Sequence, residues 1–260
     1  MNLWYLNKVN QRISIISMAA VLIISTFCAF ISFQSANAVQ SFSKDDTPFG
    51  TDYNGWLTNY WKWWVATTVD EATPKPDGCL INSTDSMVIL MDTGVNGKPH
   101  QVCNISSSQG IMIDLWSAWC DESGKDDSGT PRLSYSYDQL TKCARENFDL
   151  GAVTSLVKVD GTPVAKLDVV YSIKGGALVY QINSIENVTE IFSKGFNITI
   201  PEDTHFPDQT PGTFRSGAHG WFVFLKPLPP GDHTLYYNVG VTGLGPNDHS
   251  AEITYDLKVK

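Results

Sequence analysis

The chain has 260 residues with 18 basic and 27 acidic side chains, and its formal net charge is −9. Recognition of phosphate groups needs clustered lysine and arginine, so this balance disfavours nucleic acid and anionic lipid surfaces as partners. The length suits one domain or two small ones, and it is enough for a hydrophobic core without a structural metal.

Residues 1–38 have the three regions of a secretory signal peptide. Lys8 and Arg12 precede an uncharged apolar run over 13–33, and an Ala-Asn-Ala cleavage site ends the segment. An uncleaved N-terminal membrane anchor is the alternative, because the run approaches the ~20 residues that span a bilayer. The remainder, 39–260, is predicted to be a single β-rich extracytoplasmic domain, secreted or displayed at the cell surface.

The first predicted element of this domain is a helix over 53–69. Thr51 or Asp52 is suited to cap its start, and Pro74 prevents its continuation. Aromatic residues recur on one side of it: Tyr53, Trp56, Tyr60, Trp63 and Trp64. Leu57, Trp61 and Val65 widen this apolar stripe. Such rings can stack on sugars, but the helical spacing favours packing of the tryptophans against a sheet.

Strands dominate the rest of the chain. Runs with strand character lie at 87–91, 101–105, 111–119, 156–159, 169–173, 177–182, 196–200, 221–225, 233–239 and 251–260. A second helix is predicted over 136–148, because Ser136 and Gln139 have capping-box spacing. Asp160-Gly161 is a strong hairpin signal. Short strands separated by frequent turns indicate a mainly β fold, an antiparallel β-sandwich or jelly roll with two flanking helices.

Four cysteines follow the leader: Cys79, Cys103, Cys120 and Cys143. An even number in an exported chain predicts disulfide bonds. Of the three possible pairings we favour Cys79–Cys103 with Cys120–Cys143, because each joins near neighbours in the sequence. A zinc site is the alternative, but no zinc-knuckle spacing supports it.

Four Asn-x-Ser/Thr sequons also follow the leader, at Asn82, Asn104, Asn187 and Asn197. Each is a candidate glycosylation site in an exported chain, provided that the source organism has the glycosylation machinery. The sequence therefore predicts a disulfide-bonded glycoprotein.

Two stretches together carry a resemblance. Residues 53–64 contain Tyr-Asn-Gly-Trp and Tyr-Trp-Lys-Trp-Trp, and residues 220–235 read Gly-Trp-Phe-Val-Phe-Leu-Lys-Pro-Leu-Pro-Pro-Gly-Asp-His-Thr-Leu. They resemble an uncharacterised family of exported microbial proteins with a Trp-rich N-terminal helix and a closing Leu-x-Pro-Leu-Pro-Pro-Gly-x-His hairpin. The resemblance implies export and a shared fold, and it implies no activity. The segment 174–195 is longer than that family pattern.

Polar and aromatic side chains cluster where the strand over 111–119 meets an acidic loop. The candidate ligand-binding residues are Asp114, Trp116, Trp119, Asp121 and Glu122. Function is often carried by loops at the ends of rigid elements. Alternation along the strand places Asp114 and Trp116 on one face and Trp119 on the other. The plainer alternative is a strand end followed by a solvated loop.

Metal binding has weaker support. Carboxylates that could bind calcium are Asp121, Glu122, Asp126 and Asp127, but their spacing fits no EF-hand loop. Five histidines are scattered without short metal-ligand spacing: His100, His205, His219, His233 and His249. His233 follows a Pro-Pro-Gly turn, where a ring nitrogen is placed to bond a loop carbonyl instead. We assign no metal or other cofactor.

Enzyme signatures are also weak. Glu202, Asp203 and Asp208 offer carboxylates of the glycosidase type, but adjacent prolines indicate an exposed loop. No nucleophile elbow, phosphate-binding glycine loop or zinc-protease motif is present. We therefore predict a non-enzymatic protein that binds a ligand or belongs to a surface assembly. The partner is an unknown ligand or surface protein, with carbohydrate among the candidates. A carbohydrate-active hydrolase and a metal-binding protein are the alternatives.

Overall fold

Strands form most of the structure, a computed structural model that describes residues 39–72, 81–90, 100–124, 129, 132–146, 151–174, 177–206, 209–242 and 248–260. The expected leader lies outside the described residues, and so does Cys79. Residues Val39–Lys260 form one unit with its own core.

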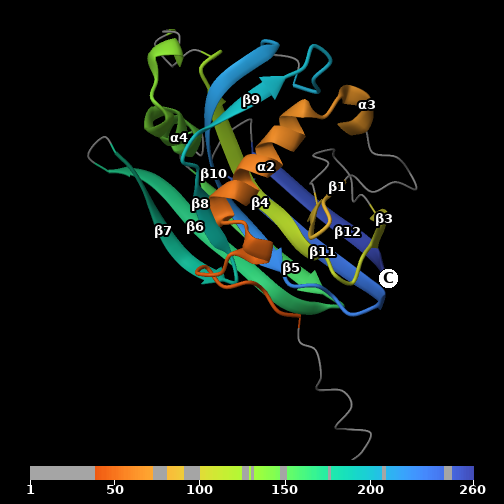
Figure 1. Ribbon diagram of the computed structural model, residues 1–260. Coiled ribbons are helices and arrows are strands. Elements are labelled where there is room, and N and C mark those ends of the chain that lie inside the picture. Colours follow the sequence, from red (N-terminus) through yellow and green to blue (C-terminus); the bar gives the residue numbers. More distant parts are fainter. Residues whose placement is uncertain are drawn as a thin grey trace, which may run out of the picture. The chain divides into compact units, whose positions relative to one another are not determined.

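The described strands form two six-stranded sheets (Figure 1). The first has the order β1 (Ile81–Ser83), β2 (Met87–Leu90), β4 (Gly110–Asp121), β10 (Gly212–Leu225) and β8 (Thr189–Phe192), and β9 (Phe196–Ile200) also pairs with β10. The second has the order β3 (His100–Ile105), β12 (His249–Val259), β11 (Gly231–Thr242), β5 (Ala152–Val159), β6 (Thr162–Lys174) and β7 (Ala177–Glu186).

The predicted β-sandwich with two flanking helices is confirmed, but its sheets are mixed and not purely antiparallel. β2 runs parallel to β4, and β3 runs parallel to β12. The other pairs among the described strands are antiparallel, such as β4 with β10 and β11 with β12. Alternation of apolar residues shows which face of a strand is buried and carries no information on the direction of its neighbour. For that reason the sequence patterns could not predict the parallel pairs.

The main core lies between the two sheets. Side chains of the first sheet, such as Ile113 and Val223, meet side chains of the second, such as Tyr237 and Leu257, all nearly or fully buried. Trp221 adds a polar link, because its indole Nε1–H donates to the hydroxyl of Tyr171 across the interface at 2.7 Å. Burial of these faces is the main favourable contribution to folding.

The helix α2 (Tyr53–Ala66) covers the other face of the first sheet, as Figure 1 shows. Asp52 caps it as expected, because its side chain accepts the backbone N–H of Gly55 at 2.7 Å. The first sheet is thus buried on both faces, and β10 is buried continuously from Ser216 to Leu225. This arrangement explains why β10 is apolar without alternation.

The buried residues of α2 all belong to the predicted stripe, but they cover only part of it. Its buried residues are Trp56, Leu57, Tyr60, Trp61 and Val65. Trp63 and Trp64, which were expected on the buried side, are only partly buried at the edge of this cluster. The dense aromatic composition fits several wheel orientations, so the sheet decides which rings are covered.

The second helix, α4 (Tyr137–Glu146), begins with the predicted capping box. The backbone N–H of Ser136 donates to Gln139 Oε1 at 2.8 Å, and the backbone N–H of Gln139 donates to Ser136 Oγ at 3.2 Å. The predicted Cys120–Cys143 disulfide ties α4 to β4. Cys103 is also disulfide-bonded, and its expected partner, Cys79, lies outside the described residues.

Three short helical segments complete the described elements. They are η1 (Pro48–Gly50), α3 (Val69–Ala72) and η2 (Arg132–Ser134). The close packing of α4 on β10 depends on Gly217, where a Cβ atom would lie 2.2 Å from the backbone nitrogen of Thr141. Any side chain at this position would push the helix away from the sheet.

His233, near the start of β11, links the Pro-Pro-Gly turn before that strand to the turn between β5 and β6. Its Nδ1 lies 2.8 Å from Asp160 Oδ2, and its Nε2 lies 2.9 Å from the carbonyl oxygen of Pro229. The predicted bond from a ring nitrogen to a loop carbonyl is therefore present. Asp160 and Gly161 both have positive φ, at 51° and 77°, as a two-residue hairpin turn requires.

Both ring nitrogens of His233 face acceptors, so the protonated ring satisfies both. Burial lowers the pKa of His233, but the bonds to Asp160 and Pro229 raise it more, and the net pKa is raised. A raised pKa in the folded state gives stability that is fully present below the unfolded pKa of about 6.5. That stability is lost as the pH rises through the folded pKa.

The first prediction concerns the contact between α2 and the first sheet. Leu57 is fully buried there, so Leu57→Ala should lower the free energy of unfolding by about 2–5 kcal/mol. The exposed Lys62 provides the control, and Lys62→Ala should have little effect. Urea denaturation of the disulfide-intact protein measures both. Equal midpoints for the two variants would contradict the assigned helix face.

The second prediction concerns pH. His233→Ala should lower the free energy of unfolding more at about pH 5.5 than at about pH 8.5. Asp160→Asn is the matched control, since it removes the charge from a turn position that asparagine tolerates. It should lower the pKa of His233, measured by NMR titration of the ring. A pH-independent effect of His233→Ala would show that the contacts of His233 with Asp160 and Pro229 do not need a protonated ring.

Candidate functional site

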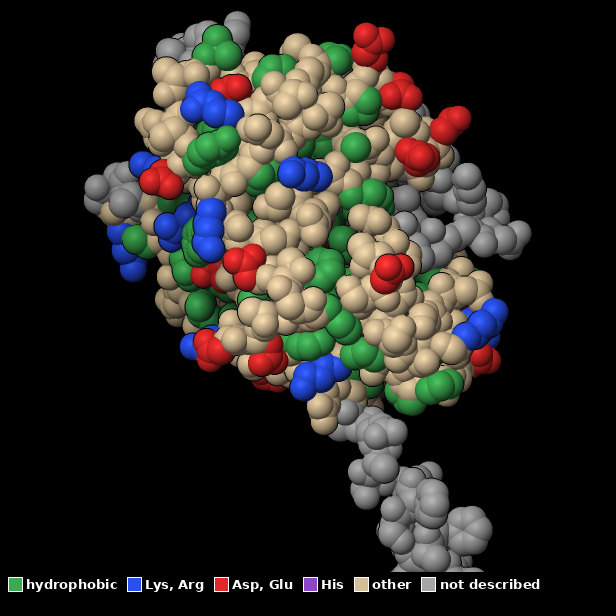
Figure 2. All heavy atoms as spheres, in the orientation of Figure 1, with side chains coloured by type: hydrophobic (Ala, Val, Ile, Leu, Met, Phe, Trp, Pro, Cys, Tyr) green, Lys and Arg blue, Asp and Glu red, His purple; other side chains and the backbone are tan. Residues whose placement is uncertain are grey.

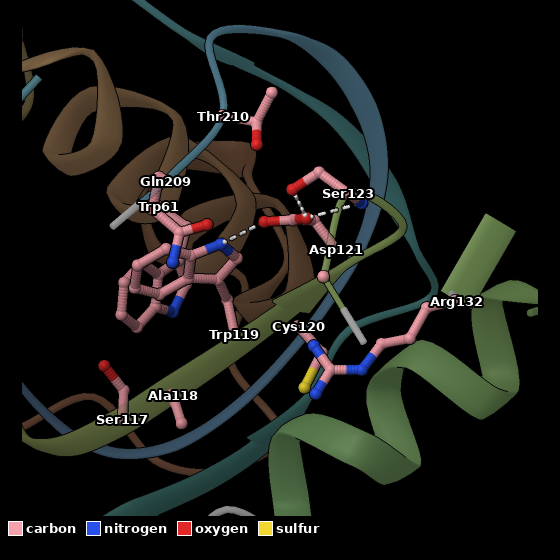
Figure 3. A pocket seen from close by; sticks show the side chains of 11 residues that line it. Trp61, Ser117, Ala118, Trp119, Cys120, Asp121, Ser123, Arg132, Gln209 and Thr210 are labelled. Carbon is pink, nitrogen blue, oxygen red and sulfur yellow. Dashed lines mark hydrogen bonds between the residues drawn. The ribbon is translucent and has the colours of Figure 1, made fainter. Parts of the chain in front are cut away.

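A cavity of about 370 Å³ opens at the end of β4 (Figure 3). Five consecutive residues of that strand line it, from Ser117 to Asp121. Trp61 of α2, the turn residues Ser123 and Gly124, Arg132 of η2, and the segment 209–210 supply the rest. The candidate site therefore combines elements that are up to about 150 positions apart in the sequence.

A bulge in β4 decides which predicted site residues face this cavity. Trp221 of β10 is opposite Trp116, whereas Phe222 is opposite Asp114, so Leu115 is the extra residue. The bulge breaks the alternation that the sequence predicted. Trp116 packs toward the core between the sheets, and Asp114 lies on the side of α2. The prediction that Asp114 and Trp116 share a face is wrong.

Asp114 is engaged in holding α2. Tyr60 donates its hydroxyl to Asp114 Oδ2 at 2.5 Å, and Ser117 donates to the same oxygen at 2.7 Å. Neither Asp114 nor Trp116 is among the residues that line the cavity. Of the five predicted ligand-binding residues, the structure therefore brings Trp119 and Asp121 into the cavity wall.

Trp119 and Trp61 form the aromatic side of the cavity. Their ring centroids are 4.6 Å apart with a tilt of 41°, and Phe206 packs edge-on against Trp119 at 4.7 Å. Trp61 is only 4% exposed, whereas Trp119 is partly exposed. Trp61 and Phe206 hold Trp119 in place, so its accessible part is pre-positioned for contact with a ligand.

Asp121 provides the acidic side of the cavity. It is 4% exposed, and each of its carboxylate oxygens has a donor (Figure 3). Trp119 Nε1–H donates to Oδ2 at 3.1 Å, and the backbone N–H of Ser123 donates to Oδ1 at 2.8 Å. The hydroxyl of Ser123 also donates to Oδ1. These bonds fix the orientation of the Trp119 ring and stabilise the buried charge.

Glu122 points to a different partner. Arg215 Nε–H donates to Glu122 Oε2 at 2.7 Å, and the backbone N–H of Arg215 donates to Oε1 at 3.2 Å. Burial alone would raise the pKa of Glu122, but the bonds from Arg215 lower it. Glu122 thus links the end of β4 to β10 and does not line the cavity. The other calcium candidates, Asp126 and Asp127, lie outside the described residues.

The cavity includes residues that sequence reasoning missed: Trp61, Ser123, Arg132, Gln209 and Thr210. Trp61 was assigned to a packing stripe, and the others lie in segments without any recognisable motif. The burial of Trp61 against Trp119 depends on how α2 crosses the sheet, which no local pattern encodes. Of the hydrolase carboxylates, Glu202 and Asp203 are exposed in a turn, and Asp208 lies outside the described residues.

The histidines with described side chains lie in separate places. His219 is fully buried, and its Nε2 lies 2.9 Å from Glu190 Oε1, whose other oxygen accepts the hydroxyl of Tyr180 at 2.8 Å. Burial lowers the pKa of His219 despite the adjacent carboxylate. His205 Nδ1 lies 2.8 Å from the carbonyl oxygen of Thr67.

His100 pairs with Asp256 at 2.7 Å, and the side chain of His249 lies outside the described residues. Within the described part of the chain, no group of three or more His, Cys, Asp or Glu side chains is arranged to hold a metal ion.

The sequons lie on or near the surface. Asn104, Asn187 and Asn197 are exposed, and Asn82 is partly exposed in β1. Asn187 Nδ2, the atom that would carry a glycan, donates to the carbonyl oxygen of Val164 at 2.8 Å. Asn197 accepts the hydroxyl of Tyr137 at 3.0 Å. Glycosylation at any of them stays a prediction.

Comparisons with protein-family models, curated proteins and solved structures found no match to this chain.

Among the described residues, no helix is both long and apolar enough to cross a membrane. The face drawn in Figure 2 carries acidic and basic side chains interspersed, with acidic side chains gathered near α3.

The third prediction tests the role of Asp121. Both of its oxygens accept hydrogen bonds, so Asp121→Asn must place an amide NH₂ against a donor. We expect a loss of about 1–3 kcal/mol in the free energy of unfolding, together with a shift in the Trp119 fluorescence. The exposed Glu202→Gln is the charge-matched control. Denaturation monitored by fluorescence gives both quantities, and unchanged stability would contradict the bonding described.

Proposed function

We propose that this chain is an exported, extracytoplasmic β-sandwich protein that binds a carbohydrate ligand in the cavity beside Trp119. The predicted leader supports export, and the disulfide between β4 and α4 is typical of chains that mature in an oxidising compartment. The observation that carries the binding function is the cavity lined by Trp61, Trp119, Asp121 and Gln209.

The size and lining of the cavity fit a small polar ligand. Its volume of about 370 Å³ lies in the range of ~300–1,000 Å³ typical of ligand sites. Sugars present apolar C–H faces and hydroxyl edges, so they need an aromatic surface beside a few polar groups. Trp119 supplies the surface, while Gln209, Thr210 and Ser123 supply the polar groups.

Binding is favoured over hydrolysis. A glycosidase of the usual kind needs two carboxyl groups that face one cleft, ~5–10 Å apart. Among the described residues that line this cavity, Asp121 is the one carboxylate, and three donors already engage it. The assembly function and the resemblance to an exported microbial family stay predictions.

The fourth prediction tests binding. Trp119→Ala should weaken binding of a neutral oligosaccharide at least about tenfold, because it removes the exposed ring of the cavity. Trp119→Phe should lose less, since it keeps a ring while losing the N–H bond to Asp121. A glycan array of the disulfide-intact secreted protein first identifies the sugar, and calorimetric titration then compares the variants.

Trp63→Phe is the matched control, because Trp63 is partly buried and does not line the cavity. It should bind as the unaltered protein does. Absence of any sugar ligand for the unaltered protein, or equal affinity for Trp119→Ala and Trp63→Phe, would overturn the proposed function.

A further inference from the structure

The cavity is lined by an arginine whose guanidinium Nε–H is accepted by no described residue. Arg132 lines the cavity, and its buried Nε–H has no hydrogen-bond partner among the described residues. None of the ion pairs between described residues includes it. A buried donor without an acceptor is costly, so such a group in a native structure requires an explanation.

The neighbouring arginine shows the contrast. Arg215 donates to Glu122 at 2.7 Å and to the carbonyl oxygen of Leu133 at 2.9 Å, and it lies over the ring of Tyr137 at 5.9 Å. Its guanidinium is thus engaged by the protein itself. Arg132 has a comparable position near the end of β4 but points its guanidinium toward Cys120 in the cavity wall (Figure 3).

The backbone near Arg132 leaves room for its guanidinium in the cavity. Its N–H donates to the carbonyl oxygen of Gly124 at 3.0 Å, which joins η2 to the turn after β4. A Cβ atom at Gly124 would lie 2.5 Å from Arg132 Nη1. The glycine therefore leaves the space in which the guanidinium lies, and a larger residue there would displace it.

A second unused donor lines the same cavity. Trp61 is 4% exposed, and its indole Nε1–H has no hydrogen-bond partner among the described residues. Both oxygens of Asp121, the one carboxylate among the lining residues, meanwhile already receive bonds from Trp119 and Ser123. The cavity thus has two donors without acceptors among the described residues, one of them on the cationic guanidinium of Arg132, and a ligand that brings negatively charged acceptors complements them.

We infer that the cavity selects an acidic saccharide, one whose carboxylate pairs with Arg132 while its ring contacts Trp119. This inference rests on the proposed carbohydrate function and adds the charge of the ligand. A planar guanidinium matches a carboxylate with paired N–H bonds. The net charge of −9 opposes anions at long range, but such repulsion is screened beyond ~8 Å at physiological salt.

The fifth prediction compares an oligogalacturonate with its methyl ester, which keeps the sugar ring and removes the charge. The unaltered protein should bind the acid at least about tenfold more tightly than the ester in calorimetric titration. Arg132→Gln should abolish this preference, so that the variant binds the acid and the ester equally. Gly124→Ala should weaken binding of the acid, because its methyl group displaces the guanidinium without removing the charge.

Lys174→Gln is the control for loss of one positive charge, since Lys174 is exposed and does not line the cavity. It should keep the preference for the acid. Equal binding of acid and ester by the unaltered protein, or a preference that survives in Arg132→Gln, would overturn the inference.

A separate titration with sodium acetate, followed by tryptophan fluorescence, distinguishes the two proposals. Should neither sugar bind, the carbohydrate function fails. Pairing of a carboxylate with Arg132 is then still supported if acetate changes the fluorescence of the unaltered protein and not of Arg132→Gln. It is overturned if acetate has no effect or acts equally on both.

Discussion

The antiparallel ladder between β4 and β10 is the interaction on which the rest of the structure depends. Its inner face packs against the second sheet, and its outer face packs against α2. With both faces covered, the backbone N–H and C=O groups of these strands must pair within the sheet. The ladder in turn presents the surface on which α2, α4 and β9 dock.

One extra residue in this ladder shapes the candidate site. Leu115 lies in a bulge, which turns Asp114 toward Tyr60 and leaves Trp119 on the side of Trp61. Bulges of this kind redirect side chains near functional sites. Because α2 and the Cys120–Cys143 disulfide hold the end of β4 from two directions, the cavity wall is organised before any ligand arrives. Such preorganisation lowers the entropic cost of binding.

Features that depend on a few adjacent residues could be read from the sequence. The Ser136–Gln139 capping box, the Asp160-Gly161 turn and the bond from His233 to a loop carbonyl are all present. Each is determined by backbone chemistry within a short segment. Trp119 and Asp121 were also identified as candidates, because they mark the point where an apolar strand meets a polar loop.

By itself, the sequence determined a β-rich fold with two helices, a disulfide from Cys120 to Cys143 and a polar strand end with aromatic residues. Only the tertiary structure decided the parallel pairs, the register with the bulge at Leu115, and the meeting of Trp61, Arg132 and Gln209 around one cavity. The physical reason is that periodicity encodes burial along one segment, whereas register and cavity shape arise from packing between segments distant in sequence.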